Sequence, residues 1–285
     1  MSLRDFLLFV GICLLWGLNL VVSKVVIGDM GVPPLFYAAL RSAVVAAAVL
    51  PWLLPVPKPY WRLVTVALLM GGGGFALLFV GLQTASPSAA AIVSQLGVPM
   101  ATLLSVIVLG ERIHWRRGIG IFLTFAGVVA VMWEPGGIDV SAGLLFVAAS
   151  AFAGALGAVL MKQMGGVRPL RLQAWVGFAS MLLLFPVSAV AESHQFAAAF
   201  RAGLPFLAML LYSGLLVSVV AHTAYYGLIM RYEANLVAPL TLMSPLFTIV
   251  FGIVLTHDRF DTRMAFGSAL ALAGVLIIAI RRSRG

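Results

Sequence analysis

The chain has 285 residues, of which 62% are hydrophobic and only 9% are charged, and its mean hydropathy is +1.11. A soluble domain of this size has no interior large enough for so much apolar surface, which excludes the soluble classes. The net charge of +9 does not indicate nucleic-acid binding, because Lys and Arg recur in short connections between apolar runs and do not gather on one element. The single cysteine, Cys13, excludes a disulfide framework and a Cys-based metal site.

Apolar runs of about 17 to 25 residues, the length that crosses a bilayer as an α-helix, recur along the whole chain. In the first half they lie near residues 5–27, 34–54, 62–82, 87–109 and 115–133. In the second half they lie near residues 141–162, 170–191, 203–229, 236–255 and 263–280. The connections between them are short and rich in Pro and Gly, as turns require. The sequence therefore predicts an all-α integral membrane protein with ten transmembrane helices.

Positive charge is distributed unequally between the two ends of these helices. The side that holds the N-terminus collects 13 of the 18 basic residues, namely Arg4, Lys58, Arg62, Arg112, Arg116, Arg117, Lys162, Arg168, Arg171, Arg231, Arg281, Arg282 and Arg284. The opposite side collects Arg201, Arg259 and Arg263, with Lys24 near its rim. Because Lys and Arg are retained in cytoplasmic loops during insertion, we expect both termini in the cytoplasm.

The two halves of the sequence resemble each other. The matches are Pro34–Pro51 with Pro169–Pro186, Pro99 with Pro245, Gly120 with Gly267, and Gly127 with Gly274. Because each half has an odd number of spans, the second half must enter the membrane from the opposite side. We therefore expect two domains, a first five-helix repeat over residues 1–137 and a second, inverted five-helix repeat over residues 138–285. Inverted repeats are typical of transporters, with the substrate site near the midplane between the halves.

Few polar side chains lie at membrane depth, and each needs a partner that lipid cannot supply. Arg41 lies seven residues into the second span. It serves either as a snorkelling or interhelical residue or as an attractor for a substrate carboxylate. Trp16 and Asn19 share one face of the first span. Asn19 either forms a hydrogen bond to a neighbouring helix or contacts substrate. Trp16 either packs against neighbouring helices or contacts substrate.

Pro99 and Pro245 occupy equivalent positions in the two halves. Each proline should leave the carbonyl four residues earlier unpaired, which is the carbonyl of Gln95 in one half and of Thr241 in the other. Two kinked helices with polar side chains beside the kinks would line a cavity on the symmetry axis. The alternative is a packing kink that neighbouring Ser or Thr side chains satisfy.

The third span contains four consecutive glycines, residues 71–74, followed by Phe75 and Phe79 at a helical spacing of four. Glycine removes side-chain bulk and weakens a helix, so Gly72 and Gly73 are candidates either for close helix packing or for a hinge. Phe79 is a candidate for the cavity wall.

The eighth span carries His222 and Tyr225 on one broad stripe, with Trp175 of the seventh span as a possible companion. Such a stripe is either ordinary packing or a substrate-facing wall that favours apolar or aromatic cargo. His222 is the only deep group whose ordinary pKa lies near neutrality. All nine Asp and Glu residues fall at helix ends or in loops, so the sequence offers no buried carboxylate of the kind that relays protons.

These features together resemble the drug/metabolite transporter superfamily, EamA type. The resemblance is carried by Trp16-Gly17-x-Asn19, Arg41, Pro99 and Gly110-Glu111, followed by a Gly-rich fifth span, within ten spans in two copies. It covers essentially the whole chain and is closest to bacterial exporters of aromatic and other neutral amino acids. It implies a bacterial inner-membrane location. The second half departs from the pattern, with Ala153-Gly154-Ala155-Leu156 and His257-Asp258 at the matching places.

We therefore expect a secondary transporter that moves small neutral or zwitterionic metabolites outward by alternating access, among them amino acids including aromatic ones. Carriers of sugar phosphates, nucleotide sugars or drugs remain open, although phosphorylated cargo calls for several buried basic residues. A channel or an intramembrane enzyme is disfavoured, because the sequence has neither a filter-like loop nor a nucleophile and base at one depth. No catalytic residue, metal, cofactor or nucleic-acid partner is expected. The partners are a small-molecule substrate and membrane lipid, with monomer and homodimer both open.

Overall fold

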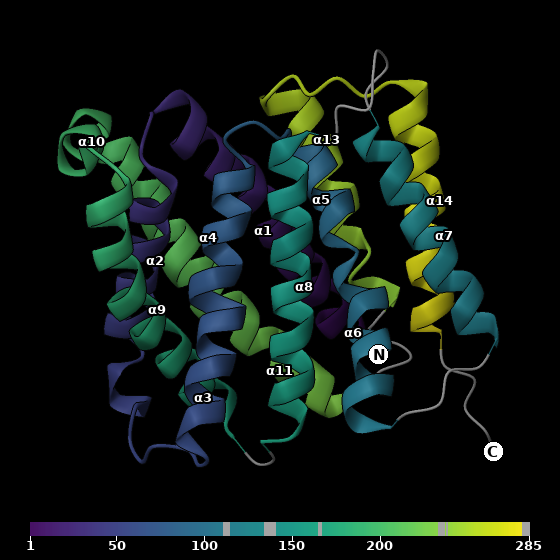
Figure 1. Ribbon diagram of the computed structural model, residues 1–285, viewed down its shortest axis with the longest axis horizontal. Coiled ribbons are helices and arrows are strands. Elements are labelled where there is room, and N and C mark those ends of the chain that lie inside the picture. Colours follow the sequence, from purple (N-terminus) through teal and green to yellow (C-terminus); the bar gives the residue numbers. More distant parts are fainter. Residues whose placement is uncertain (111–114, 134–140, 165–166, 233–236, 238, 281–285) are drawn as a thin grey trace.

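The computed structural model describes residues 1–110, 115–133, 141–164, 167–232, 237 and 239–280. Within these residues every element is a helix, and the helices stand side by side in one bundle (Figure 1). The predicted all-α class is therefore confirmed. Two predicted features lie outside the described residues. They are the domain boundary at residues 137 and 138 and the acidic residue of the Gly110-Glu111 motif.

Two lists give the bounds of the helices. The N-terminal part contains α1 (Leu3–Lys24), η1 (Val25–Asp29), α2 (Pro34–Ala48), η2 (Leu50–Trp52), α3 (Tyr60–Ala67), η3 (Leu68–Gly73), α4 (Gly74–Gly81), α5 (Pro87–Ser94), α6 (Gly97–Leu109) and α7 (Trp115–Met132). The C-terminal part contains α8 (Ala142–Lys162), α9 (Pro169–Ala191), α10 (Gln195–Leu211), η4 (Tyr212–Ala221), α11 (His222–Arg231), α13 (Met243–Leu255) and α14 (Thr262–Ala279).

Eight helical stretches within the described residues are long and apolar enough to cross a membrane. They are Leu3–Asp29, Tyr60–Gly81, Pro87–Leu109, Trp115–Met132, Ala142–Lys162, Pro169–Ala191, Gln195–Tyr225 and Thr262–Ala279. The apolar helices α2 and α13 have only 15 and 13 residues. At about 1.5 Å per residue each covers roughly 20 Å, less than the ~30 Å hydrocarbon core, so the predicted second and ninth spans are shorter than the sequence indicates.

The eighth predicted span also differs from the structure at its start. Helix α10 begins at Gln195, well before the predicted residue 203. The chain breaks direction at Gly203, which has φ 60° and ψ −144°, a conformation that glycine adopts readily. The apolar run that the sequence indicates thus begins at this break, and a short amphipathic piece precedes it.

Local sequence explains where several helices begin. Pro34, Pro87 and Pro169 occupy the first turn of α2, α5 and α9, where a missing N–H costs nothing. The side chain of Asp261 accepts a hydrogen bond from the backbone N–H of Met264 at 2.7 Å and caps α14. These starts agree with the predicted spans within a few residues.

Three segments adopt π-helical geometry that the hydrophobic pattern does not indicate. They are η1, η3 with its glycines, and the ten-residue η4. A π-helical turn widens the backbone ring and is frequent at functional sites. Gly72 packs against Ser180 of α9, whereas Gly73 meets chiefly the carbonyl of Leu68 in its own segment. The glycine run therefore combines close packing with irregular backbone.

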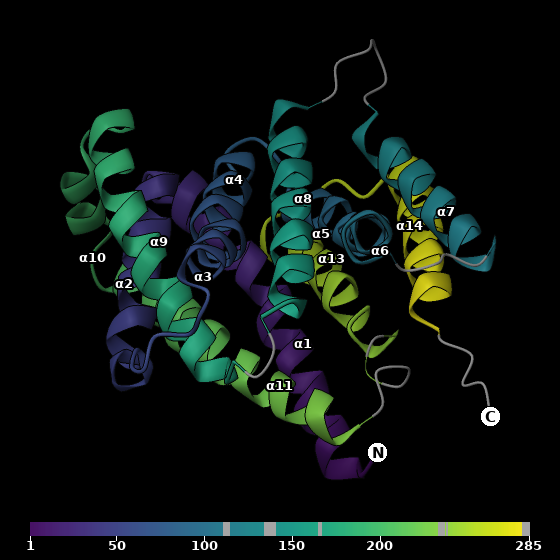
Figure 2. The same ribbon diagram turned by 60° about the horizontal axis from the view of Figure 1, so that its bottom comes forward.

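Helices α7 and α14 pack tightly at one end of the bundle, as both views show (Figures 1 and 2). A Cβ atom on Gly120 would lie 2.7 Å from the carbonyl oxygen of Gly274, and one on Gly127 would lie 2.6 Å from that of Gly267. Because residue numbers rise along α7 as they fall along α14 at these contacts, the two helices are antiparallel. Glycine is required here for backbones to approach so closely.

Three polar ties join helices at the end of the bundle opposite to the start of α1. Both carboxylate oxygens of Glu192 accept backbone N–H bonds from the first turn of α2, at 2.8 and 2.9 Å. The Nζ atom of Lys24 donates to the carbonyl of Leu82 at 2.8 Å, beyond the end of α4. Asp258 accepts from the backbone N–H of Ser88 at 2.9 Å and so caps α5. Such charge-assisted bonds are stronger than neutral ones, so they hold the helix ends together at this end of the bundle.

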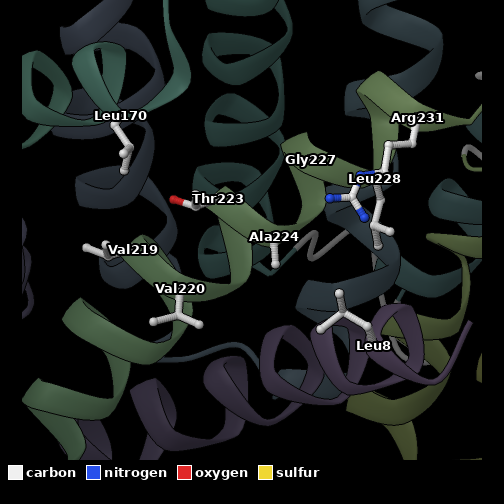
Figure 3. A pocket seen from close by; sticks show the side chains of 9 residues that line it. All are labelled: Leu8, Leu170, Val219, Val220, Thr223, Ala224, Gly227, Leu228 and Arg231. Atoms are coloured by element: carbon white, nitrogen blue, oxygen red, sulfur yellow. The ribbon is translucent and has the colours of Figure 1, made fainter. Parts of the chain in front are cut away.

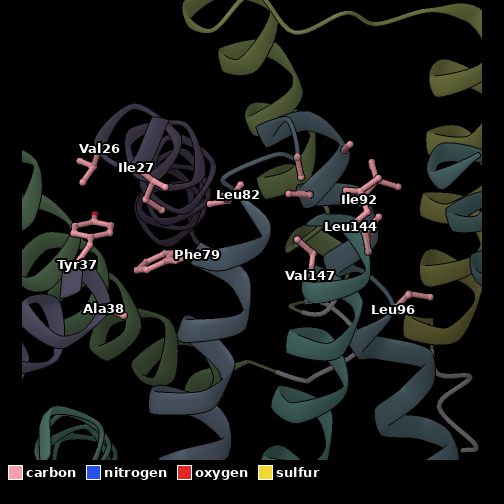
Figure 4. Close-up of a cluster of buried hydrophobic side chains, with 14 of the residues drawn as sticks. Val26, Ile27, Tyr37, Ala38, Phe79, Leu82, Ile92, Leu96, Leu144 and Val147 are labelled. Atoms are coloured by element: carbon pink, nitrogen blue, oxygen red, sulfur yellow. The ribbon is translucent and has the colours of Figure 1, made fainter. Parts of the chain in front are cut away.

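The main hydrophobic core lies between α1 with η1, α2, α4, α5 and α8 (Figure 4). Tyr37 and Phe79 are both fully buried and stack with ring centroids 4.8 Å apart. Val26, Ile92 and Val147 extend the cluster across the bundle. This core holds in register the helices that surround the cavity described next.

Candidate functional site

A central cavity of about 280 Å³ lies among seven helical segments, α1, α2, α4, α5, η4, α11 and α13. Its polar lining residues are Trp16, Asn19, Arg41, Ser94, Gln95, His222, Ser244 and Thr248. The apolar part of the wall comes from residues such as Leu20, Phe75 and Leu78. Because the helices come from both halves of the chain, the cavity exists only in the folded protein.

Arg41 is the one Lys or Arg among the described residues that line this cavity, and only 4% of its surface is exposed. Its Nε and Nη2 atoms donate to the hydroxyl oxygen of Ser218 at 3.1 and 2.8 Å. Ser218 itself donates to the carbonyl of Ser213 at 2.8 Å, so its hydroxyl is oriented to accept from the guanidinium. The π-helical η4 brings both serines to this side of the helix.

Two further features fix the guanidinium of Arg41. Its Cζ atom lies 3.7 Å from the ring centroid of Phe75, which is a cation–π contact. Its Nη1 atom is buried without a hydrogen-bond partner, and among the described residues no carboxylate pairs with the side chain. A buried cation with a free donor needs an anion or water to compensate its desolvation. The arrangement leaves the Nη1 edge of the guanidinium, where a carboxylate could bind, without a partner in the described structure.

Two neighbouring polar groups are also buried without partners in the described structure. These are the indole Nε1 of Trp16, a donor, and the amide Oδ1 of Asn19, an acceptor. Buried polar atoms are normally hydrogen-bonded, so unpaired ones indicate a ligand or water position. The cavity thus combines free donors with a free acceptor, which suits a molecule carrying both a carboxylate and an ammonium group.

His222 lies where η4 gives way to α11. Its Nδ1 atom is 2.8 Å from the carbonyl of Val217, which orients the ring. The ring packs against Trp16, with centroids 5.2 Å apart. Trp16 also makes an edge contact with Tyr225 at 4.9 Å. The aromatic stripe therefore contributes to the cavity through His222 and Trp16, with Tyr225 behind them.

Of the nine predicted substrate-binding residues, the structure brings five to the central cavity: Trp16, Asn19, Arg41, Gln95 and His222. The other four do not line it. Phe79 lies in the core and stacks on Tyr37. Trp175, near the start of α9, donates a hydrogen bond to the carbonyl of Leu53 at 3.0 Å. Tyr225 packs on Trp16 and Phe9. Thr241 lies in the turn before α13 and is outside the lining set.

The proline pair behaves as predicted in one respect and not in another. The helices break near both prolines, since α5 ends at Ser94 before α6 begins at Gly97, and α13 begins at Met243. The expectation of free carbonyls is wrong. The carbonyl of Gln95 accepts from Val98 N at 3.1 Å, and that of Thr241 accepts from Ser244 N at 3.0 Å. A tight turn before each proline supplies these bonds, so only the side chains remain available. Pro245 lines the cavity, whereas Pro99 is buried within α6.

Two residues of the candidate site were not singled out from the sequence. Phe75 was noted only as part of the glycine segment, yet it stacks on Arg41 and lines the cavity, whereas Phe79 one turn further on does not. Ser218, four residues before His222 in the eighth predicted span, is the anchor of Arg41. The spacing of four places both rings on nearly the same face of α4, one turn apart, so it cannot decide which of them lies at the level of the cavity.

A second, smaller chamber of about 90 Å³ adjoins the central cavity and shares Arg41, Phe75 and His222 with it. Its other walls include Met70, Val176 and Gln173. Gln173 donates through Nε2 to the carbonyl of Ser218. The guanidinium, the phenyl ring and the imidazole therefore form a partition between two spaces.

Comparison with known proteins identifies the family. The model described as the EamA-like transporter family matches residues 4–133 and again residues 141–280. The chain belongs to this family. As an EamA-like transporter it is a membrane transport protein, and its family and relatives indicate transport and not catalysis.

The relatives of this EamA-like transporter align along nearly its whole length. It is 26% identical to a protein of Escherichia coli (strain K12) described as a probable amino-acid metabolite efflux pump, with 97% of this chain and 95% of the relative covered. A protein of Salmonella typhimurium with the same description is 27% identical over the same shares. The uncharacterized transporter YvbV of Bacillus subtilis is 26% identical, with 96% and 91% covered.

A solved crystal structure of another protein has the same fold. It aligns with 97% of this chain and 96% of its own, with a TM-score of 0.59 and 20% sequence identity. At that identity the likeness concerns the arrangement of helices alone.

Proposed function

We propose that the protein exports small zwitterionic or neutral metabolites, amino acids among them, across a bacterial inner membrane. The observation that carries this proposal is the buried guanidinium of Arg41, which has a free Nη1 donor beside the unpaired acceptor Oδ1 of Asn19. A substrate carboxylate would bind the first group and an ammonium the second. Two relatives described as probable amino-acid metabolite efflux pumps support the same substrate class and direction.

The alternative of phosphorylated cargo is less well supported. A sugar phosphate or nucleotide sugar carries more than one negative charge and calls for several buried cations. Among the described residues, Arg41 is the only Lys or Arg that lines the central cavity. One buried cation pairs with one carboxylate, and the ammonium group of an amino acid would then meet the neutral acceptor Oδ1 of Asn19.

Alternating access by two inverted five-helix repeats is the proposed mechanism. The glycine contacts between α7 and α14 support it, because the repeat equates Gly120 with Gly267 and Gly127 with Gly274. The contact of Gly120 with Gly274 then maps onto that of Gly127 with Gly267, as two-fold symmetry requires. Helices α2 and α9, also equivalent in the repeat, pack through Gly177, where a Cβ atom would lie 3.1 Å from the carbonyl oxygen of Ser42. The hydrogen bonds of Lys24, Glu192 and Asp258 between helix ends would form one gate.

The proposed substrate class is tested with purified protein in proteoliposomes loaded with unlabelled amino acids. We expect saturable uptake of labelled neutral amino acids that is accelerated by substrate on the opposite side, as a carrier requires. Because the described cavity contains no carboxylate to relay protons, flux should proceed down the substrate gradient without an imposed pH gradient. Flux that neither saturates nor counter-exchanges would indicate a channel, and exchange restricted to phosphorylated compounds would refute the substrate class.

Orientation follows from the charge asymmetry, with both termini proposed to be cytoplasmic. Lys58 and Arg259 are both exposed, in loops at opposite ends of the bundle. In intact cells, Arg259→Cys should react with a membrane-impermeant maleimide, whereas Lys58→Cys should react only after permeabilisation. Mass spectrometry of the labelled protein provides the readout. The reverse pattern would overturn the charge argument.

Phe75 should position Arg41 for substrate. Replacing Phe75 by Leu removes a cation–π contact worth about 0.5–2 kcal/mol, so the KM of carboxylate-bearing substrates should rise roughly threefold to thirtyfold with a smaller change in kcat. Phe75→Tyr keeps an aromatic face and should restore the wild-type KM. Phe79→Leu is the matched control, because Phe79 lies outside the cavity and its ring centroid is farther from Cζ of Arg41, at 5.8 Å against 3.7 Å for Phe75. Equal effects of both Leu variants on KM would contradict this role.

A further inference from the structure

A lateral groove lies on the outside of the bundle between α1, α9 and the η4–α11 stretch (Figure 3). Its volume is about 510 Å³, and its apolar wall is formed by Leu8, Leu170, Val219, Val220, Ala224 and Leu228. It shares no lining residue with the central cavity. The side chains of Leu8 and Val220 are 47% and 53% exposed, so the groove opens toward the surface that faces the bilayer.

The apolar surface of the groove continues along α1. An adjoining hollow of about 540 Å³ shares Leu8, Val220 and Ala224 with it and extends to Leu18 and Phe251. The two hollows therefore form one continuous apolar track from the end of α11 toward the middle of the bundle.

One charged side chain stands at the end of this track. Arg231, the last residue of α11, is 70% exposed, and Figure 3 shows its guanidinium turned back toward the groove. Its contact with Asp5 is loose, at 4.0 Å between Nη1 and Oδ1. The other oxygen of Asp5 already accepts a hydrogen bond from the hydroxyl of Tyr232 at 2.6 Å. Arg231 therefore keeps donors available for an anion.

The length of the groove matches one leaflet of a membrane. From Val219 to Arg231 the helix advances twelve positions, or roughly 18 Å at about 1.5 Å per residue. One leaflet contributes about 15 Å to a hydrocarbon core of about 30 Å. An acyl chain that starts at the level of Arg231 would thus end near the inner limit of the groove.

We propose that the lateral groove is a phospholipid-binding site, with one acyl chain along the apolar wall and the phosphodiester at Arg231. A single cation at one end of a track whose other lining residues are apolar, apart from Thr223, complements an amphiphile with one phosphate. A free phosphate ion would use only the cation and would leave the apolar wall uncovered. The leaflet is the one at which α1 begins, because Asp5 and Arg231 lie together there.

The experiment is native mass spectrometry of the full chain after reconstitution in vesicles of phosphatidylcholine and phosphatidylglycerol and gentle extraction. Wild type should retain one phosphatidylglycerol per chain. Arg231→Gln should reduce its retention about fivefold, the weight of one Arg near an anionic headgroup. Gly227→Leu should reduce retention of either lipid at least about tenfold by filling the track. The described structure has nothing within 4 Å of a Cβ atom on Gly227, so this variant should fold.

Two control variants separate specific retention from the general lipid annulus. Gly118 of α7 is exposed and also has open space around it in the described structure, and Arg201 of α10 is an exposed cation elsewhere. Gly118→Leu and Arg201→Gln should retain lipid like wild type. Equal loss in the groove and control variants, undiminished retention in Gly227→Leu, or displacement of the lipid by inorganic phosphate alone would overturn the site. The site would also be overturned if the wild-type protein were a dimer without bound lipid and Gly227→Leu converted it to a monomer.

Discussion

Replacing Arg41 by Gln is expected to reduce export of carboxylate-bearing amino acids at least about thirtyfold while leaving the protein folded. Removing one partner of a desolvated charged contact costs about 2–5 kcal/mol, which sets this magnitude. The melting temperature should stay level or rise, because the variant no longer buries a cation that lacks an anionic partner in the described structure. The hydroxyl of Ser218 keeps its bond to Ser213, so the substitution leaves no new unpaired group there. Transport in proteoliposomes and thermal melting in detergent measure the two quantities.

A substrate variant sharpens this test. Wild type should transport an amino acid amide, which lacks the carboxylate, much more slowly than the parent amino acid, and Arg41→Gln should abolish that discrimination. Arg201→Gln is the matched control, since it removes an exposed cation of α10. A structural role for Arg41 would appear as a lower melting temperature with unchanged selectivity, and that result would exclude it from the substrate site.

Replacing Gly127 by Leu is expected to destabilise the protein by about 2–3 kcal/mol, or roughly 5–10 °C in melting temperature. A side chain at this position meets the backbone of α14, with the carbonyl oxygen of Gly267 only 2.6 Å from the new Cβ atom. Backbone cannot move aside as a flexible side chain does, so the two helices must separate. Thermal unfolding followed by circular dichroism measures the loss.

Gly118→Leu provides the matched control for this prediction. Gly118 lies on the same helix, is exposed, and has open space around it in the described structure. Because glycine disfavours a helix by about 1 kcal/mol, this control should leave the melting temperature unchanged or slightly raised. Equal destabilisation by the two variants would show that the close approach of α7 and α14 does not limit stability.

The sequence predicted the class of the protein well because long apolar runs have few structural outcomes. A run such as residues 141–162 can only be a buried or membrane-crossing helix, and its ends agree with α8 to within about one residue. The shorter helices were predicted less well. Apolar composition continues beyond Ala48, but proline ends α2 there and a 3-10 turn follows, which hydropathy alone does not register.

The candidate site was predicted in part, and the reason is geometric. Polar residues at membrane depth are few, so Arg41, Asn19 and Gln95 could be selected by rarity, and the structure brings them to one cavity. Aromatic residues are numerous, and rarity does not distinguish Phe75 from Phe79. Both rings lie on nearly the same face of α4, one turn apart, and only the packing of the surrounding helices decides which of them reaches the cavity.

By itself, then, the sequence determined what must be buried in a membrane and which polar groups would need partners there, because transfer free energies depend on residue type alone. Only the tertiary structure decided which partners are met. The hydroxyl of Ser218 reaches Arg41 from 177 residues away, and the carboxylate of Glu192 caps α2 from 157 residues away. Contacts of that separation depend on helix rotation and packing, to which glycines and π-helical turns contribute, and a local pattern does not encode those rotations.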